Sequence, residues 1–417
     1  MTKKRIAIVS DLHIGDSARE FDLRPGGSPA YAGQKGYLDS FEEDVQRFDV
    51  AADYLVVSGD ITDRAQPSQF SHAGKVITRI ARALKVPDDA IISVPGNHDL
   101  NWDVAKLATD GGEAFWLGYR FAPFASGHDV FGKWCSIGDR SLIEEPHFTL
   151  RSFGDCDFWS FNSAAYDTPD KKPHRGEIRE KHREELHAAL KAAYSGQARN
   201  KYRVFVTHHH LRPQRDPHPD QPDFSTMING DALLDMLIEH QFDLVMHGHK
   251  HRPWCRSFVE AARDPIVVWC SGSFSQTLGA SYYGSIGNLW HLVELHGRRE
   301  GSDDCFGQAR SWAYAPGRGW VPSRPNEHGI DHVTPFGYVA DRHTIQSLVT
   351  DALTSILASR QFVTWAELCD SHEALRYQAG TVVWPILEAV CPQLGARPHG
   401  DRDSLDGLII LSTTVTP

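Results

Sequence analysis

The chain lacks the features by which secreted and membrane proteins are usually recognised. Its seven cysteines are odd in number, widely spaced and contain no CxxC pair, which argues against a disulfide framework and favours reduced thiols. No apolar stretch approaches the length of a transmembrane helix. The apolar run Ile6 to Val9, which follows a basic N-terminus, is too short for the core of a signal peptide. We therefore expect a cytoplasmic protein that makes no membrane contact.

An excess of basic residues is also missing. The 43 Lys and Arg residues are outnumbered by 54 Asp and Glu residues, and the formal net charge is -11. This balance argues against a sequence-independent nucleic-acid surface, although it leaves room for a local positive groove. A hydrophobic content of 41% and a charged content of 23% are ordinary for a globular protein. A length of 417 residues is enough for one large core and a smaller second unit.

The first two thirds of the chain alternate short apolar runs with segments of helical periodicity. Such alternation predicts βαβ units and a layered α/β fold, in which ligands bind on loops at the carboxyl ends of strands. The runs that we predict as buried strands are Ile6–Val9, Tyr54–Val57, Ile91–Val94, Val204–Val206, Leu244–Met246 and Ile266–Trp269.

Three segments interrupt this pattern. Residues 100–155 are rich in aromatic side chains without clean strand spacing, which predicts an inserted cap beside the site or a satellite hydrophobic cluster remote from substrate. A Pro-, His- and Asp-rich loop, residues 212–223, is expected to overhang the same mouth. Ser311–Tyr314 and Gly319–Val321 flank a turn and predict a hairpin at the edge of the main domain. We place the domain boundary near Gly329, giving domains of 1–329 and 330–417.

The C-terminal domain is predicted to be small and mainly helical. Apolar residues run at helical spacing from Ile345 to Leu357, and Thr364-x-x-Glu367 has the form of a capping box. A third helix over Val383–Val390 and a closing strand at Leu408–Leu411 complete an arrangement that could be winged-helix-like. Because acidic residues outnumber arginines here, packing or contact with a protein partner is favoured over nucleic-acid binding.

Five short motifs carry side chains that bind metals, and each follows a predicted strand. Taken singly, each has an ordinary explanation, such as a helix cap, a turn or a histidine cluster. Together they supply carboxylate, amide and imidazole ligands without thiolate, a set that suits two divalent cations such as Mn²⁺, Fe or Zn²⁺. The motifs are Asp11-Leu12-His13, Gly59-Asp60, Gly96-Asn97-His98-Asp99, His208-His209-His210 and His247-Gly248-His249.

The order D-x-H, GD, GNH[DE], H and GHxH resembles that of the calcineurin-like metallophosphoesterases over about Arg5 to His296, with the last motif matched to His247-Gly248-His249. The resemblance implies a four-layer α-β-β-α sandwich and a pair of bridged cations. It implies that one cation is held by Asp11, His13, Asp60 and His249, and the other by Asp60, Asn97, His208 and His247.

The resemblance also implies a catalytic role for His98, which is not used as a ligand. We expect His98 to protonate the leaving oxygen as a general acid, oriented by Asp99 or Asp63, while a metal-bridging hydroxide attacks phosphorus. Four further residues are weaker candidates for phosphate contact, since each could equally be a solvated surface side chain. They are Arg64, His209, His210 and His251.

The leading functional hypothesis is hydrolysis of a small phosphodiester. The GNHD form of the third motif and the long interval from Gly15 to Ala52 resemble class III cyclic-nucleotide phosphodiesterases and related bacterial enzymes more than phosphoprotein phosphatases. A metal-dependent nuclease and a phosphomonoesterase are the enzymatic alternatives. A phosphoesterase fold reused as a non-enzymatic scaffold is the remaining one.

Overall fold

The structure is a computed structural model, and the first sheet of its larger unit has seven strands. The strand order is β12-β11-β10-β1-β2-β3, and β13 also pairs with β11. The three strands β1, β2 and β3 are parallel, while β10 to β13 extend the sheet in antiparallel fashion. Their bounds are β1 Lys4–Val9, β2 Tyr54–Ser58, β3 Ile91–Val94, β10 Leu289–Arg298, β11 Cys305–Ala315, β12 Gly319–Pro322 and β13 Val333–Phe336.

The structure describes most of the chain, with several gaps. The described residues are 2–28, 35–102, 121, 142–167, 174–196, 199–213, 225–258, 265–279, 286–298, 305–337, 341–378, 380–400, 405 and 407–413.

The second sheet has six strands in the order β4-β5-β6-β7-β9-β8. Its central strands β5, β6, β7 and β9 are parallel, and the two edge strands are antiparallel to their neighbours. The bounds are β4 Phe148–Ser152, β5 Cys156–Phe161, β6 Tyr202–Val206, β7 Leu244–His247, β8 Pro253–Phe258 and β9 Ile266–Ser271.

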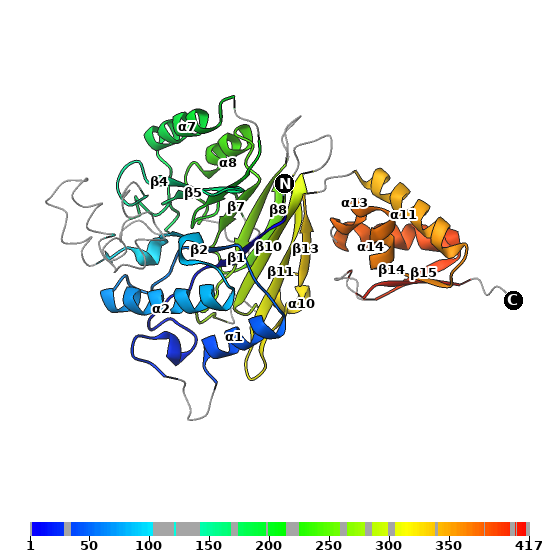
Figure 1. Cartoon of the computed structure of the whole chain (residues 1–417), viewed down its shortest axis with the longest axis horizontal. Coiled ribbons are helices and arrows are strands. Elements are labelled where there is room, and N and C mark those ends of the chain that lie inside the picture. Colours follow the sequence, from blue (N-terminus) through cyan, green and yellow to red (C-terminus); the bar gives the residue numbers. More distant parts are fainter. Residues whose placement is uncertain are drawn as a thin grey trace.

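Helices cover the outer face of each sheet, as Figure 1 shows. The helices α1 (Tyr37–Arg47) and α2 (Pro67–Ala83) lie on the first sheet, and α7 (Glu180–Tyr194) and α8 (Gly230–Glu239) lie on the second. The main core contains side chains of both sheets, and a second core lies between the second sheet and its helices. The predicted four-layer α-β-β-α sandwich is therefore confirmed. The described part of this unit also contains four short helices: η1 Phe21–Leu23, η2 Asp88–Ala90, η3 Asn97–Asp99 and α10 Pro325–His328.

All six predicted strands are present, but the main unit extends further than expected. The hairpin forms as β11 and β12, and β11 starts at Cys305, earlier than the pattern indicated. The following strand β13 pairs with β11 and ends at Phe336. The larger unit therefore continues beyond the boundary placed near Gly329, because the chain returns to cover one side of β11.

The predicted cap over residues 100–155 is only partly described. Residues 103–120 and 122–141 lie outside the described residues, as does most of the loop 212–223. The end of the cap segment forms β4, which is an edge strand of the second sheet. This part therefore belongs to the core fold, because β4 pairs with β5 along its whole length.

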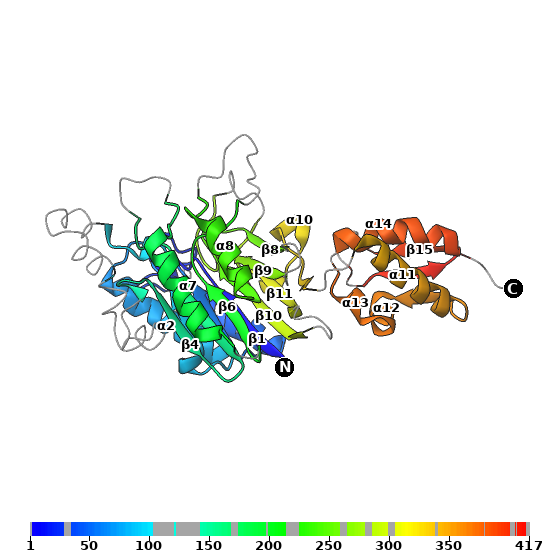
Figure 2. The same ribbon diagram turned by 90° about the horizontal axis from the view of Figure 1, so that it is seen from above.

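The C-terminal unit has its own hydrophobic core and lies to one side of the larger unit (Figure 1 and Figure 2). Tyr377 links the two, since its hydroxyl is 3.1 Å from His296 Nδ1 and its ring contacts Phe306. Pro385 lies inside α14. The elements are α11 Arg342–Leu357, β14 Phe362–Thr364, α12 Trp365–Ser371, α13 Glu373–Arg376, α14 Gly380–Val390, η6 Cys391–Leu394, β15 Ala396–His399 and β16 Ile409–Ser412.

The described residues bear on the expected reduced thiols and on the expected lack of a transmembrane helix. The six cysteines among them are free thiols. Among the same residues, no helix combines the length and apolar character needed to cross a membrane.

A buried carboxylate on β10, that of Glu294, helps to hold the first sheet together. Glu294 accepts a hydrogen bond from Gln308 Nε2 at 2.8 Å and lies 3.0 Å from Lys3 Nζ. Burial alone would raise the pKa of Glu294, but its partners, led by His296, outweigh burial and hold that pKa well below its usual range. The ionised carboxylate is thus the form that the folded sheet stabilises.

We predict that Glu294→Gln lowers the free energy of unfolding at pH 7 by about 2 kcal/mol, the scale of hydrogen bonds to a charged group. Because the folded-state pKa is depressed, this contribution is complete above about pH 4.3 and is lost as the pH falls through the folded-state value. Urea unfolding at pH 7 and pH 3 measures it, with Glu184→Gln on the exposed part of α7 as the control. An equal loss of stability at both pH values would contradict the prediction.

Candidate metal centre

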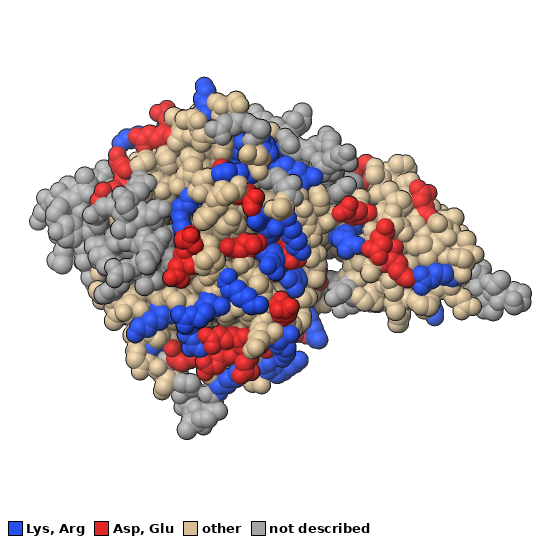
Figure 3. Space-filling model, in the orientation of Figure 1, with Lys and Arg blue, Asp and Glu red and all other residues tan. Residues whose placement is uncertain are grey.

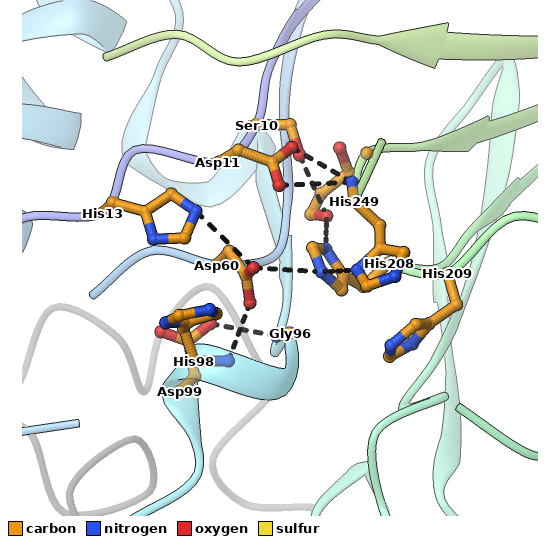
Figure 4. A network of polar contacts seen from close by, with 12 residues as sticks. Ser10, Asp11, His13, Asp60, Gly96, His98, Asp99, His208, His209 and His249 are labelled. Carbon is orange, nitrogen blue, oxygen red and sulfur yellow. Dashed lines mark hydrogen bonds and ion pairs between the residues drawn. The ribbon is translucent and has the colours of Figure 1, made fainter. Parts of the chain in front are cut away.

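The predicted ligands lie on loops that follow parallel strands of both sheets. Asp11 and His13 follow β1, Asp60 follows β2, and Asn97 opens the short helix η3 after β3. His208 follows β6, and the histidines from His247 onward close β7. Figure 4 shows the side chains of Asp11, His13, Asp60, His208 and His249 converging on one region. The expectation that ligands gather at the carboxyl ends of strands is therefore realised in the fold.

The backbone at this centre is strained. Eleven non-glycine residues in the described part of the chain have a positive φ. Such residues are uncommon, cost free energy and cluster at functional sites. Five of the eleven belong to the centre, namely Asp11, His13, Asp60, His249 and His251, with φ between 47° and 73°.

Three glycines let the loops approach one another closely. A Cβ on Gly248 would lie 2.4 Å from Asp11 Oδ2, and one on Gly96 would lie 2.2 Å from Asp60 Oδ1. Gly59, with φ of +93°, would place a Cβ 2.4 Å from His208 Nδ1. None of these positions can accept a side chain without displacing a predicted ligand.

Asp60 lies at the middle of the cluster. Its Oδ1 accepts the backbone N–H of His98 at 2.8 Å. Its Oδ2 is 3.6 Å from His13 Nε2 and 3.3 Å from His208 Nε2. One oxygen is thus fixed by the backbone, and the other faces histidines that come from different sheets.

His251, and not His249, lies with Asp11, His13 and Asp60, the residues expected to hold the first cation. His251 Nε2 is 3.0 Å from Asp11 Oδ1 and 3.4 Å from His13 Nε2. The ligand atoms of Asp11, His13, Asp60 and His251 all lie within 4.8 Å of one another. His251 was considered only for phosphate contact in the sequence, so its place here is a correction.

His249 lies instead beside His208, which was expected to bind the second cation. Its Nδ1 is 3.3 Å from His208 Nε2, and its backbone N–H donates to the Asp11 carboxylate. His247, expected here, is instead the last residue of β7, pairs with Cys270 and donates from Nδ1 to the carbonyl of Gly248. The strand runs one residue past its predicted end at Met246, and the histidines that lie among the converging ligand atoms are His249 and His251.

The imidazole rings of the centre differ in the direction of their pKa shifts. Burial, together with neighbouring histidines, holds the pKa values of His13 and His249 well below their usual range, so both rings are neutral. Burial opposes protonation of His208 as well, but the charge of Asp60 outweighs it and raises the pKa of His208 to about 9. For Asp60, burial is likewise outweighed by His208, so the pKa of this carboxyl is well below its usual range.

The loop that carries His98 is held by Asp99. The Asp99 carboxylate accepts the backbone N–H groups of Ile61, Thr62 and Gly96 at 2.8–3.1 Å. Burial and the charge of Asp60 raise the pKa of Asp99 to about 6. Asp99 therefore fixes the loop, and the expectation that it orients the His98 ring is not met, because its oxygens are directed to the backbone.

The His98 ring is oriented by the main chain of Asp63. Nδ1 lies 2.9 Å from the Asp63 carbonyl oxygen, to which it donates. This contact leaves Nε2 for another partner. Burial lowers the pKa of His98, but Asp60 and the Asp63 carbonyl outweigh burial and raise it.

The weaker sequence candidates occupy different environments. Arg64 has a side chain that is 71% exposed. His209 and His210 are fully buried, so neither is a solvated surface residue. The His209 ring packs 4.3 Å from that of His249, centroid to centroid.

The side chains present fit a pair of divalent cations. Within the described residues, Asn97 Oδ1 is a buried acceptor without a hydrogen-bond partner, which is costly unless something else satisfies it. Neutral imidazoles, carboxylates and an amide oxygen are the forms in which these residues bind metals. The second shell is also in place, since His208 Nδ1 donates to the carbonyl of Ser58 at 2.9 Å.

A scan against protein-family models matches residues 4–253 to the calcineurin-like phosphoesterases. The match covers more than half of the chain, and the chain belongs to this family. Family membership and the Asp/His cluster together indicate divalent metal ions as cofactors. No curated protein matches the sequence.

Solved structures of low sequence identity also match. A Streptococcus pneumoniae protein described as a predicted phosphoesterase is 14% identical, with 81% of this chain and 98% of that chain covered and a TM-score of 0.31. Phosphopantetheinyl hydrolase from Mycobacterium tuberculosis is 15% identical, with 64% and 89% covered and a TM-score of 0.31. NAD nucleotidase from Haemophilus influenzae is 8% identical, with 78% and 54% covered and a TM-score of 0.34.

The two possible positions of the last ligand pair can be told apart by mutation. We predict that His251→Ala lowers the bound Mn²⁺ by about one ion per chain, because it removes a group within 3.0 Å of Asp11. His247→Ala should retain both ions, because His247 belongs to neither group of converging ligand atoms and its Nδ1 donates to the carbonyl of Gly248. Metal analysis after gel filtration measures the content. Loss of an ion from His247→Ala alone would restore the original assignment.

Proposed function

We propose that this phosphoesterase hydrolyses a small phosphodiester with the help of two divalent cations. The observation that carries the proposal is the position of Asp60 Oδ2, which lies within 3.6 Å of a histidine nitrogen from each sheet. A carboxylate so placed can bridge two cations ~3.5–4 Å apart, the spacing used for in-line displacement at phosphorus.

The ligand set of the proposal follows the geometry rather than the original matching of the last motif. Asp11, His13, Asp60 and His251 would hold one cation. Asp60, Asn97, His208 and His249 would hold the other. Such a pair, when bound, supplies a water of lowered pKa and neutralises charge on the phosphoryl oxygens.

His98 is the proposed general acid. Because Nδ1 donates to the Asp63 carbonyl, Nε2 is free to face a leaving oxygen. Asp99 supports this role indirectly, since it fixes the backbone on which His98 stands.

We predict that His98→Ala lowers turnover by a factor on the order of 10²–10⁴ while two Mn²⁺ ions stay bound. His72→Ala is the matched control, because His72 also hydrogen-bonds a backbone carbonyl, that of Asp22, and is half-buried. Turnover and metal content should be measured on the same samples. Full activity in His98→Ala would remove its assignment as the acid.

The choice of a diester rests on the GNHD motif and on the resemblance to class III phosphodiesterases. We predict faster hydrolysis of bis(p-nitrophenyl) phosphate than of p-nitrophenyl phosphate in the presence of Mn²⁺, measured as kcat/KM for each. A higher kcat/KM for the monoester would overturn the diester proposal and leave a phosphomonoesterase.

A nuclease is the less favoured alternative. On the face drawn in Figure 3, Lys and Arg side chains are interspersed with Asp and Glu. A phosphate backbone is bound through clustered cations, and the net charge of -11 works against long-range attraction of DNA.

A further inference from the structure

His209 is buried between the proposed ligands and a loop that the proposed function leaves unused. Its side chain is inaccessible to solvent. Its ring lies 4.3 Å from the ring of His249 and 4.9 Å from that of His208, centroid to centroid. Figure 4 shows it beside these two rings, on the side away from Asp11 and His13. A residue so placed cannot touch substrate, but it can restrict the motion of both neighbouring rings.

Both nitrogens of His209 are directed to the loop that follows β5. Nδ1 is 2.8 Å from Ser163 Oγ, and Nε2 is 3.5 Å from Asp167 Oδ2. The Ser163 hydroxyl also accepts the backbone N–H of His209 at 3.2 Å. The hydroxyl proton can therefore be donated to Nδ1, which leaves the ring proton on Nε2, facing the carboxylate. Nδ1 is then engaged by Ser163, while Nε2 faces Asp167 without a hydrogen bond. The ligand atoms of His208, His209 and His249 lie within 4.8 Å of one another, so a direct ligand role for His209 is the alternative that the test below decides.

A fourth close-packed glycine supports this arrangement. Gly176 has φ of +68°, and a Cβ there would lie 2.4 Å from His209 Nδ1. The same residue donates its backbone N–H to Asp167 Oδ1 at 3.2 Å. His209 is thus fitted as tightly as Asp60 and His208, which Gly96 and Gly59 crowd to a similar degree.

We propose that His209, held by Ser163 and Asp167, is a positioning residue that fixes the rings of His208 and His249 for the second cation. This inference rests on the proposed function, because His208 and His249 are ligands only if the metal pair binds. The physical reason is rotameric: Ser163 holds Nδ1 and Gly176 closes on the ring, so His209 limits how far the rings packed against it can turn. Groups that orient ligands in this way typically contribute a factor of 10–100 to metal affinity.

The test is an isothermal calorimetric titration of the metal-free full chain with Mn²⁺. Ser163→Ala and His209→Leu are expected to weaken the second Mn²⁺ by about 10- to 100-fold and to leave the first unchanged. Ser311→Ala is the matched control, because Ser311 Oγ is also 2.8 Å from a buried histidine, His291, whose other contact is the carbonyl of Ser271. Melting temperatures of the two serine variants show whether they lose similar stability.

Each result decides between specific explanations. Selective weakening of the second ion by Ser163→Ala, with Ser311→Ala like the wild type, supports the proposal. Unchanged binding in Ser163→Ala and His209→Leu overturns it, as does equal weakening of both ions. Complete loss of one ion in His209→Leu alone would show that His209 is itself a ligand, and would overturn the positioning role. A wild-type chain that binds fewer than two Mn²⁺ ions would refute the proposed function, and this inference with it.

Discussion

The arrangement of the catalytic core depends on one buried carboxylate, that of Asp60. It is inaccessible to bulk water, yet histidines from both sheets and the His98 backbone surround it. An isolated buried charge is too costly to persist. The charge of Asp60 raises the pKa of His208 to about 9, and a cation bound beside Asp60 would meet the same need for positive charge.

Much of the fold was predictable because its central strands are parallel and buried on both faces. Such strands are continuous apolar runs, and Ile91–Val94 coincides with β3. Strand β10 was missed because it carries His291 and Glu294, which are buried but polar. Their partners, Ser311 and Gln308, lie on the neighbouring strand β11. Pairing of this kind is a tertiary property, so the sequence pattern of one strand does not contain it.

The candidate site was predictable in type but not in every position. Asp11, His13, Asp60, Asn97 and His208 lie where the strand pattern placed them. The segment His247 to His251 contains three histidines at alternate positions. The pattern GHxH fits Gly248-His249-Lys250-His251 residue for residue, so the pair His249 and His251 could have been found from spacing, and the match to His247-Gly248-His249 was a misalignment. Spacing does not give the positive φ of His249 and His251 or the ligand group that each ring joins, because both depend on how the loops pack.

The ligand loops come from two different sheets, and this origin constrains how the enzyme can vary. Asp11 and Asp60 belong to one half of the sandwich, while His208 and His249 belong to the other. The coordination sphere is therefore only as accurate as the packing of the inter-sheet core. Substitution of a remote apolar residue such as Phe158 or Leu55 would alter how the two halves pack and, with it, the spacing of the ligand side chains. Laboratory evolution of this scaffold would accordingly select repacked interiors as often as altered active-site side chains.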